Sequence, residues 1–297
     1  MVKQKTIYLT LFVATFAVSW AAILIKLSGA GPLPTAFYRM ALASIILAVP
    51  ALPKVRRALR ALDGKDILLL ATSGIFLGLH FAVWVTSLFY TTISNSAILV
   101  ATQPVWVLIL EATVLKERIP PRSVIGMMVA LVGIIIISGG DFDMGRDYII
   151  GDLLALAGAI FAGLYLFIGR RLRAKLDNMG YIVPVYTTAA VTLLIISLFY
   201  GVNLTDYSMK TWLIFLLLAL IPTVVGHSLY NWLLKFVQAH IVATTVLGEP
   251  IGATILAIFF FDQIPGWWTL IGGVLILSGI FIVLKKRRKK ENIIIPE

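Results

Sequence analysis

The chain has 297 residues, of which 60% are hydrophobic and 13% are charged, and its formal net charge is +11 at pH 7. A soluble domain of this size needs far more charged and polar surface, so the composition excludes a soluble globular protein. The absence of cysteine excludes disulfides and Cys-based metal sites. The positive charge does not indicate a nucleic-acid partner either, because the basic residues lie between long apolar runs.

These apolar runs number ten, and most approach the roughly 20 residues that a helix needs to cross a bilayer. In chain order they cover residues 6–27, 32–52, 66–88, 92–115, 121–139, 149–170, 180–201, 210–234, 241–261 and 266–285. The first run is too long for a signal-peptide core, so we expect it to be retained. The sequence therefore predicts an all-α integral membrane protein with ten transmembrane helices and no soluble domain between them.

Lysine and arginine are unevenly distributed between the two sides of this arrangement. Most of the 25 lie on the side of the N-terminus, in the segments that follow every second helix and in the run Lys285–Lys290. The positive-inside rule then predicts a multi-pass protein of the cytoplasmic membrane with both termini in the cytoplasm, as an even number of helices requires. We interpret the basic run as an anchor for anionic lipid head groups, with a protein partner as the alternative.

The two halves of the chain match each other at a nearly fixed offset. Offsets of 145 to 147 residues align Ala14 with Ala159, Pro104 with Pro250 and His80 with His227. This predicts two repeats, residues 1–140 with helices one to five and residues 141–297 with helices six to ten and a basic cytoplasmic tail. Because five is odd, the second repeat must be inverted, an arrangement typical of alternating-access transporters. A duplication without a mechanistic role is the alternative.

Histidines lie inside two of the apolar runs, where polar groups are costly and usually face a cavity or a partner. Trp84 follows His80 by one turn, and Tyr230 and Asn231 follow His227 at i+3 and i+4, so each set shares a helical face. Aromatic rings could stack on a solute while histidine and asparagine supply hydrogen bonds. The pair favours cavity lining over simple bonds between helices. No further ligands accompany it, so no zinc site is expected.

Gln103-Pro104 and Glu249-Pro250 occupy matching positions in the fourth and ninth predicted helices. Proline removes one helical hydrogen bond, and paired helix breaks point to a transport site. Glu249 is the one carboxylate near the centre of a predicted span. It could carry a proton, pair with a cationic solute, or hydrogen-bond a neighbouring helix.

Other polar residues give weaker signals. Trp20 and Tyr165 occupy corresponding positions in the two halves and could line the cavity or pack between helices. Arg39 could bind a carboxylate or phosphate, extend to the outer surface, or pair with an acid. Glu111 could pair with a neighbouring base. The predicted cavity residues are thus His80, Trp84, Gln103, Tyr165, His227, Tyr230, Asn231 and Glu249, with Trp20 and Arg39 as weaker candidates and Pro104 and Pro250 as helix breaks.

Glycines recur where small residues let membrane helices approach closely. Gly74 and Gly78 form a GxxxG pattern, and pairs spaced by seven recur in the fifth and tenth predicted helices. These pairs are Gly126 with Gly133 and Gly272 with Gly279. We assign all six glycines to close contacts between helices.

Over nearly its whole length the chain resembles the drug/metabolite transporter superfamily, in particular its EamA-domain members. The resemblance rests on Gln103-Pro104, Glu249-Pro250, Lys116–Pro120 leading into Gly126, Gln263–Pro265 leading into Gly272-Gly273, and the stretches around His80 and His227. It implies a central cavity formed by the first four helices of each repeat, with the fifth packed outside. Gln263 departs from the glutamate that family repeats often carry, which is expected to alter a helix-end interaction.

The resemblance and the repeat together predict a secondary transporter that exports or exchanges amino acids, amines or drug-like solutes by alternating access. No nucleotide-binding motif is present, so no ATP and no other cofactor is expected, and a coupling proton could be carried by Glu249. The chain is predicted not to be an enzyme. The rival interpretations are a passive channel or facilitator and a membrane-embedded enzyme that uses His80, His227 and Glu249.

Overall fold

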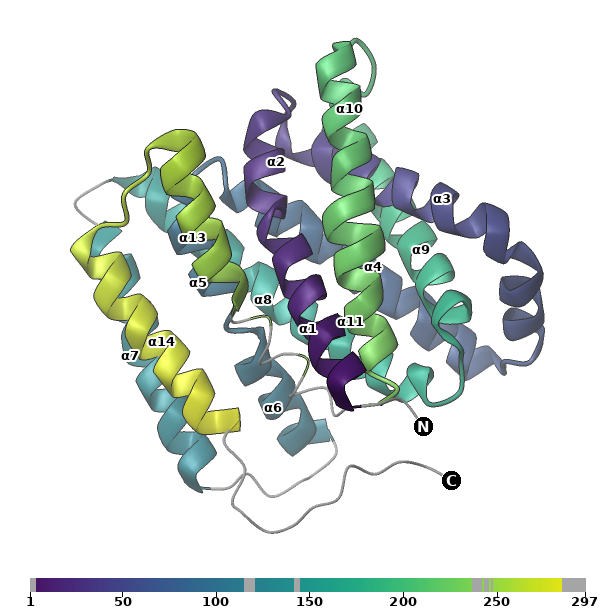
Figure 1. The fold of residues 1–297 in the computed structure, drawn as a ribbon, viewed down its shortest axis with the longest axis horizontal. Helices are drawn as coiled ribbons and strands as arrows, with labels where there is room; N and C mark the ends of the chain where they lie inside the picture. The colour runs from purple at the N-terminus through teal and green to yellow at the C-terminus, as the bar shows by residue number, and fades with distance from the viewer. Residues whose placement is uncertain are drawn as a thin grey trace.

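A computed structural model describes residues 4–114, 121–141, 145–236 and 248–284, together with Val242 and Val246. The described residues form helices and connecting loops without any strand (Figure 1). Lys116–Pro120 and Lys285–Lys290 lie outside them, so the anchoring role of the basic run stays a prediction. The helices are α1 (Gln4–Ser19), α2 (Ala21–Leu27), α3 (Pro32–Arg60), α4 (Gly64–Ser87), α5 (Ile93–Val100), α6 (Gln103–Val114), α7 (Pro121–Asp141), α8 (Arg146–Arg173), α9 (Asn178–Phe199), α10 (Met209–Leu218), the π-helix η2 (Ala219–His227), α11 (Ser228–Leu233), α13 (Gly248–Phe261) and α14 (Trp267–Leu284).

Seven helical segments of the described chain are long and apolar enough to cross a membrane. They are Lys5–Leu27, Pro32–Arg60, Gly64–Ser87, Ile93–Val114, Arg146–Arg173, Asn178–Phe199 and Met209–Leu233. Three shorter apolar helices, Val124–Ile137, Gly248–Phe261 and Trp267–Gly279, lie in the three remaining predicted spans. Large apolar side chains such as Phe12 and Phe199 are exposed, as expected of surfaces that face lipid. The molecule is an all-helical, multi-pass membrane protein.

Polar side chains in the loops determine where several helices begin. In each case an oxygen of the residue before the helix accepts a hydrogen bond from the backbone N–H three residues later, which satisfies a donor that the helix itself leaves free. These caps are Asp63 for α4, Thr92 for α5, Asp177 for α9 and Ser208 for α10. The short polar connections therefore fix the register of the helices that follow them.

Three of the long segments are interrupted. A turn at Trp20 separates α1 from α2, and Ala101 and Thr102 separate α5 from α6. The segment Met209–Leu233 contains the π-helix η2, with Pro222 inside it. The sequence pattern did not indicate this widened turn, and such π segments are frequent at functional sites. Pro50 and Pro53 lie inside α3, which bends in its second half (Figure 1).

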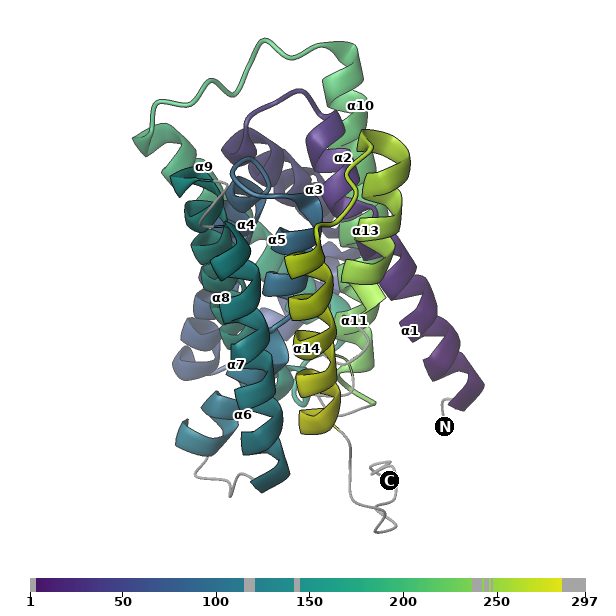
Figure 2. The same ribbon diagram turned by 90° about the vertical axis from the view of Figure 1, so that its left-hand side faces the viewer.

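Glycines bring helices of the two halves into direct contact. A Cβ atom on Gly74 would lie 2.5 Å from Thr188 Cβ, so α4 and α9 touch there through backbone. A Cβ atom on Gly133 or on Gly272 would lie 2.6 Å from the carbonyl oxygen of the other. Accordingly, α7 and α14 lie side by side at one edge of the molecule (Figures 1 and 2). The predicted role of these glycines in close helix contact is confirmed.

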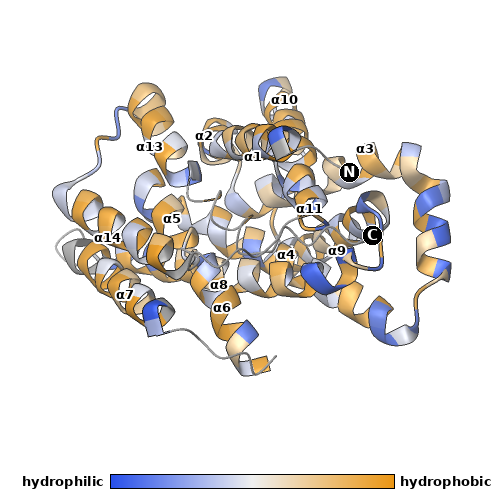
Figure 3. Ribbon diagram, turned by 60° about the horizontal axis from the view of Figure 1, so that its bottom comes forward, coloured by the Kyte–Doolittle hydropathy of each residue, from blue (hydrophilic) through white to orange (hydrophobic). Residues whose placement is uncertain are grey.

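The helices of the first half pack mainly against those of the second half. α4 lies against α8 and α9, α3 against α9, and α1 against η2 and α13. α1 begins and α14 ends at the same end of the bundle, the lower end in Figures 1 and 2. Figure 3 shows hydrophobic residues over most of the helices and hydrophilic ones gathered on the last part of α3, where Arg56, Arg57 and Arg60 are exposed. The packing brings α1, α4, α6, α8, α11 and α13 together around the site described next.

Candidate functional site

A small cavity lies where helices of both halves meet. Its volume is about 50 Å³, which is room for a few water molecules. The wall is formed by Val18, Leu77, His80, Trp84, Val100, Gln103, Ala162, Tyr165, Leu166, His227, Tyr230, Asn231, Val242, Val246 and Glu249. The structure thus brings together all eight of the main residues that the sequence predicted for a cavity. That they bind a solute stays a prediction.

His80 and Trp84 form one side of the wall, one turn apart on α4. The two rings stack, with centroids 5.8 Å apart and planes 5° from parallel. Nδ1 of His80 lies 2.9 Å from the carbonyl oxygen of Gly158 on α8, and because a carbonyl can only accept, Nδ1 carries the proton. A Cβ atom on Gly158 would lie 3.1 Å from Trp84 Cβ. The small residue on α8 therefore lets these two rings pack against its backbone.

Another part of the wall is held by a hydrogen-bonded chain from α8 and α11. The hydroxyl of Tyr165 donates to Oδ1 of Asn231 at 2.7 Å, and Nδ2 of Asn231 donates to the carbonyl of His227 at 2.8 Å. Oγ1 of Thr15 and the hydroxyl of Tyr230 are 2.8 Å apart, which joins α1 to the same wall. Asn231 thus has its side chain fixed in one orientation, with both ends in use.

Gln103 and Glu249 face the cavity from the first turns of α6 and α13. First turns carry the positive end of the helix dipole, which favours negative charge or acceptor groups nearby. The break between α5 and α6 immediately precedes Gln103-Pro104, whereas Pro250 lies within the first turn of α13. Most residues between 237 and 247 lie outside the described chain, so a matching helix break before α13 stays a prediction. Among the described residues no ion pair involves Glu249.

The two weaker candidates do not line the cavity. Trp20 is half-buried at the turn between α1 and α2, and its ring meets Phe260 edge-on at 5.7 Å. Arg39 is fully buried, so it does not extend to the outer surface. Its Nε donates to Oγ1 of Thr223 in η2 at 2.7 Å, and its guanidinium lies 4.3 Å from the ring centroid of Phe81.

Arg173 is a buried residue next to the cavity wall that the sequence does not single out. The sequence groups it with its exposed neighbours Arg170 and Arg171 as a topology signal, and no local pattern distinguishes it from them. In the structure it is 1% exposed, and its Nε donates to the carbonyl of Asn231 at 3.0 Å. Its Nη1 donates to the carbonyl of Leu176 at 2.5 Å. Arg173 therefore supports the backbone directly behind a cavity residue.

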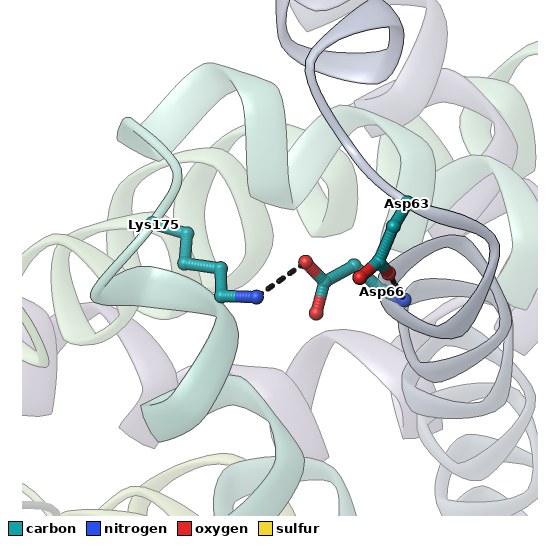
Figure 4. Close-up of polar contacts among 3 residues, drawn as sticks. All are labelled: Asp63, Asp66 and Lys175. Atoms are coloured by element: carbon teal, nitrogen blue, oxygen red, sulfur yellow. Dashed lines mark hydrogen bonds and ion pairs between the residues drawn. The ribbon is translucent and has the colours of Figure 1, made fainter.

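Two ion pairs join the last part of α8 and the loop after it to the first half of the chain. Nζ of Lys175 lies 2.5 Å from Oδ2 of Asp66, next to the helix cap formed by Asp63 (Figure 4). Nη1 of Arg170 lies 2.6 Å from Oε1 of Glu111, which confirms the predicted pairing of Glu111 with a neighbouring base. Both pairs lie beyond the cavity, toward the end of the bundle where α4 begins.

Gln263 contacts the start of a helix in the other half of the chain. Its Oε1 accepts a hydrogen bond from the backbone N–H of Ile93, the first residue of α5, at 3.2 Å. The side chain therefore satisfies a free helix-end donor, in agreement with the helix-end role expected for this position.

The sequence and fold also match those of known proteins. The model of the EamA-like transporter family matches residues 5–139 and again residues 149–285. An uncharacterized transporter of Archaeoglobus fulgidus is 26% identical over 295 residues, covering 97% of this chain and 100% of that protein. A probable terminal-alkyne amino-acid exporter of Streptantibioticus cattleyicolor is 26% identical over 285 residues, covering 94% of this chain and 92% of its own.

One further relative and a solved structure extend the comparison. An uncharacterized transporter of Acidianus ambivalens is 30% identical over 239 residues, covering 77% of this chain and 88% of its own. A crystal structure with 18% sequence identity superimposes with a TM-score of 0.68, covering 94% of this chain and 96% of that one. At this identity the likeness concerns the fold.

Proposed function

Since this chain belongs to the EamA-like transporter family and is a membrane transporter, we propose that it exports or exchanges small metabolites across the cytoplasmic membrane by alternating access. The observation that carries the proposal is the cavity. Eight polar and aromatic residues from both halves of the chain line the same space, although polar groups are costly to bury in a membrane. A site at the junction of two halves is accessible from either side in turn when the halves rock.

The proposal includes ten membrane-spanning helices in two inverted repeats, residues 1–140 and 141–297. In support, the family model matches twice, once in each half. The seven long apolar segments and three shorter apolar helices together fall in the ten predicted spans. The shared location of the start of α1 and the end of α14 fits an even number of crossings. We place this end, with its many basic residues, in the cytoplasm.

The cavity in this conformation is smaller than a metabolite, so transport requires it to widen. A ligand site for a drug-sized molecule has roughly 300–1,000 Å³, against about 50 Å³ here. On the proposed orientation, the pairs Lys175–Asp66 and Arg170–Glu111 lie between the cavity and the cytoplasm. We assign them to an inner gate, which opens when α8 and the loop after it separate from α4 and α6.

Glu249 is proposed to carry the coupling proton. It is a carboxylate in the cavity wall, at the first turn of α13, with no ion-pair partner among the described residues. A carboxylate in that position can exchange its proton with whichever side the cavity faces. Glu249→Gln, which cannot release a proton, should abolish solute uptake driven by a pH gradient in proteoliposomes while solute exchange without a gradient continues.

The test begins with a thermal-shift screen of the purified protein against amino acids, amines, nucleobases and vitamins, followed by counterflow of the hits in proteoliposomes. A carrier shows counterflow and saturation. Flux that neither saturates nor shows counterflow would assign the protein to passive facilitators or channels. Chemical conversion of a hit by the detergent-solubilised protein would point to enzymatic use of His80, His227 and Glu249. Full gradient-driven uptake by Glu249→Gln would contradict the proton role.

A further inference from the structure

Arg39 is a buried arginine that the protein satisfies only in part. Its side chain is fully buried, and Nε is bonded to Oγ1 of Thr223. Nη1 and Nη2 have no hydrogen-bond partner among the described residues, and neither of the ion pairs found there includes Arg39. Burying a charged group whose terminal nitrogens lack hydrogen-bond partners is unfavourable, and within a membrane protein such a group marks a functional site.

Arg173 shows how the same fold satisfies an arginine that has a structural role. It is equally buried, and it donates to two backbone carbonyls, those of Asn231 and Leu176. The terminal nitrogens of Arg39 donate to no such carbonyl among the described residues. The terminal N–H groups of its guanidinium are therefore left for a group that the described part of the chain does not supply.

The guanidinium of Arg39 is close to the cavity. It lies 4.3 Å from the ring centroid of Phe81 and 5.9 Å from that of Trp84, and Trp84 belongs to the cavity wall. The ring of Phe81 in turn meets the ring of His227, another wall residue, edge-on at 5.5 Å. Arg39 thus lies close to two aromatic rings, of which one, Trp84, belongs to the cavity wall. Rotation of Phe81 about its side-chain bonds would expose the guanidinium to a solute in the widened site.

We infer that Arg39 is the binding group for a carboxylate of the transported solute, an inference that rests on the proposed transport function. The fork of a guanidinium matches the two oxygens of a carboxylate, and the desolvated setting strengthens the contact. Glu249, an acidic residue in the same cavity wall, disfavours a second carboxylate on the solute when it is ionised. The apolar and aromatic wall accommodates an uncharged body. The solute class is therefore monocarboxylates with an apolar or aromatic side group, and an amino group is not required.

Binding to the full-length protein in nanodiscs tests the inference with matched acid and amide pairs. The probes are 3-phenylpropionate with 3-phenylpropionamide, L-phenylalanine with L-phenylalaninamide, and L-leucine with L-leucinamide, and phenylsuccinate serves as a dicarboxylate. At least one acid should bind roughly 10- to 100-fold more tightly than its amide, because the amide loses the charge-assisted contact. Phenylsuccinate should bind more weakly than 3-phenylpropionate.

Variants identify the residue responsible. Arg39→Gln should bring acid affinity down to that of the amide, and Arg39→Lys, which keeps the charge and loses the fork, should fall between. A second measurement needs no ligand. Arg39→Met should leave the melting temperature unchanged or raise it by roughly 2–4 °C, because it removes a buried charged group with two unbonded nitrogens. Arg173→Met, the matched control, should lower the melting temperature because it leaves two buried carbonyls without a donor.

The outcomes separate this inference from the transport proposal. Equal affinity for acids and amides, discrimination that survives Arg39→Gln, or a large loss of stability in Arg39→Met would each overturn the role of Arg39. If amines or neutral solutes show counterflow and no acid of the panel binds, transport stands and the carboxylate site falls. If no solute shows counterflow, the transport proposal fails, and the melting temperatures of the two methionine variants still decide whether Arg39 is structural.

Discussion

Individual side chains connect the cavity to the end of the bundle through continuous hydrogen bonds. Tyr165 donates to the side chain of Asn231, and Arg173 donates to the backbone carbonyl of the same Asn231. The second carbonyl that Arg173 binds is that of Leu176, in the loop that also contains Lys175, the partner of Asp66. A solute that displaces Asn231 would therefore act on the same loop that holds an ion pair, over a short path of named contacts.

Tyr165→Phe tests the cavity side of this path. The change leaves Oδ1 of Asn231 without its donor, which should cost about 1 kcal/mol in stability and raise the KM for counterflow by roughly five- to tenfold. Tyr181→Phe is the matched control, because the hydroxyl of Tyr181 lies 2.8 Å from Oγ of Ser73 and the residue does not line the cavity. It should lower the melting temperature to a similar extent with an unchanged KM. An equal rise in KM for both variants would contradict the assigned role of Tyr165.

At the scale of single elements, interruptions occur where helices meet the cavity. The α5–α6 break precedes Gln103, and the π-helix η2 ends at His227. Thr223 in η2 donates its hydroxyl to the carbonyl of Leu218, five residues earlier, and accepts from Arg39. The wider π-helical turn thus places the hydroxyl of Thr223 next to the buried guanidinium of Arg39. By contrast, α7 and α14, which form the far edge of the molecule, are regular along their described lengths.

Glycine contacts between elements give a prediction about stability. Gly74→Ala places a Cβ atom 2.5 Å from Thr188 Cβ and 2.8 Å from the carbonyl oxygen of Val185, so α4 and α9 must separate. We expect a loss of about 1–3 kcal/mol, measured as a lower melting temperature. Gly64→Ala at the start of α4 has open space around its Cβ and should change stability by less than about 0.5 kcal/mol. Equal melting temperatures for the two variants would show that the α4–α9 contact can relax.

The inner gate can be tested at the same scale, because the chain has no cysteine of its own. Leu77→Cys places a single reactive thiol in the cavity wall. Adding Asp66→Asn and Glu111→Gln removes both ion pairs and should raise the rate of labelling by a polar maleimide from the cytoplasmic side by roughly two- to fivefold. Asp147→Asn, an exposed carboxylate at the start of α8, serves as the control. If the double substitution leaves the labelling rate unchanged, the two ion pairs do not form an inner gate.

At the scale of the whole molecule, the two halves form one packing unit. The cavity wall and the contacts of α4 with α8 and α9 all combine residues from both halves. Residues 1–140 expressed alone should therefore be degraded, and so should residues 141–297. Co-expression of the two fragments should restore a complex that purifies together and binds the same solutes. A stable, monodisperse first half would show that the repeats are independent domains.

Much of this arrangement follows from the sequence because a membrane makes burial of polar groups costly. The residues that violate the apolar pattern, such as His80 and Glu249, were recognisable for that reason, and they line one cavity. The sequence does not distinguish Trp20, which packs against Phe260, from a residue that lines the cavity. It also does not distinguish the buried Arg173 from its exposed neighbours Arg170 and Arg171. In the widened turn of η2, Thr223 accepts a hydrogen bond from Arg39 in the first half of the chain, a tertiary contact that no local pattern encodes. The apolar part of the cavity wall was equally hidden among many other aliphatic residues.

The glycine contact between α7 and α14 has a mechanical consequence. These helices belong to different halves, and each glycine of the pair Gly133 and Gly272 lies against the backbone of the other. No residue that the structure describes in either helix lines the cavity. If the halves rock to open one side and then the other, a fixed line must exist somewhere about which they turn, and a tight backbone contact remote from the moving wall provides it. The edge of the molecule would then act as the pivot, and the cavity would lie where the displacement is large.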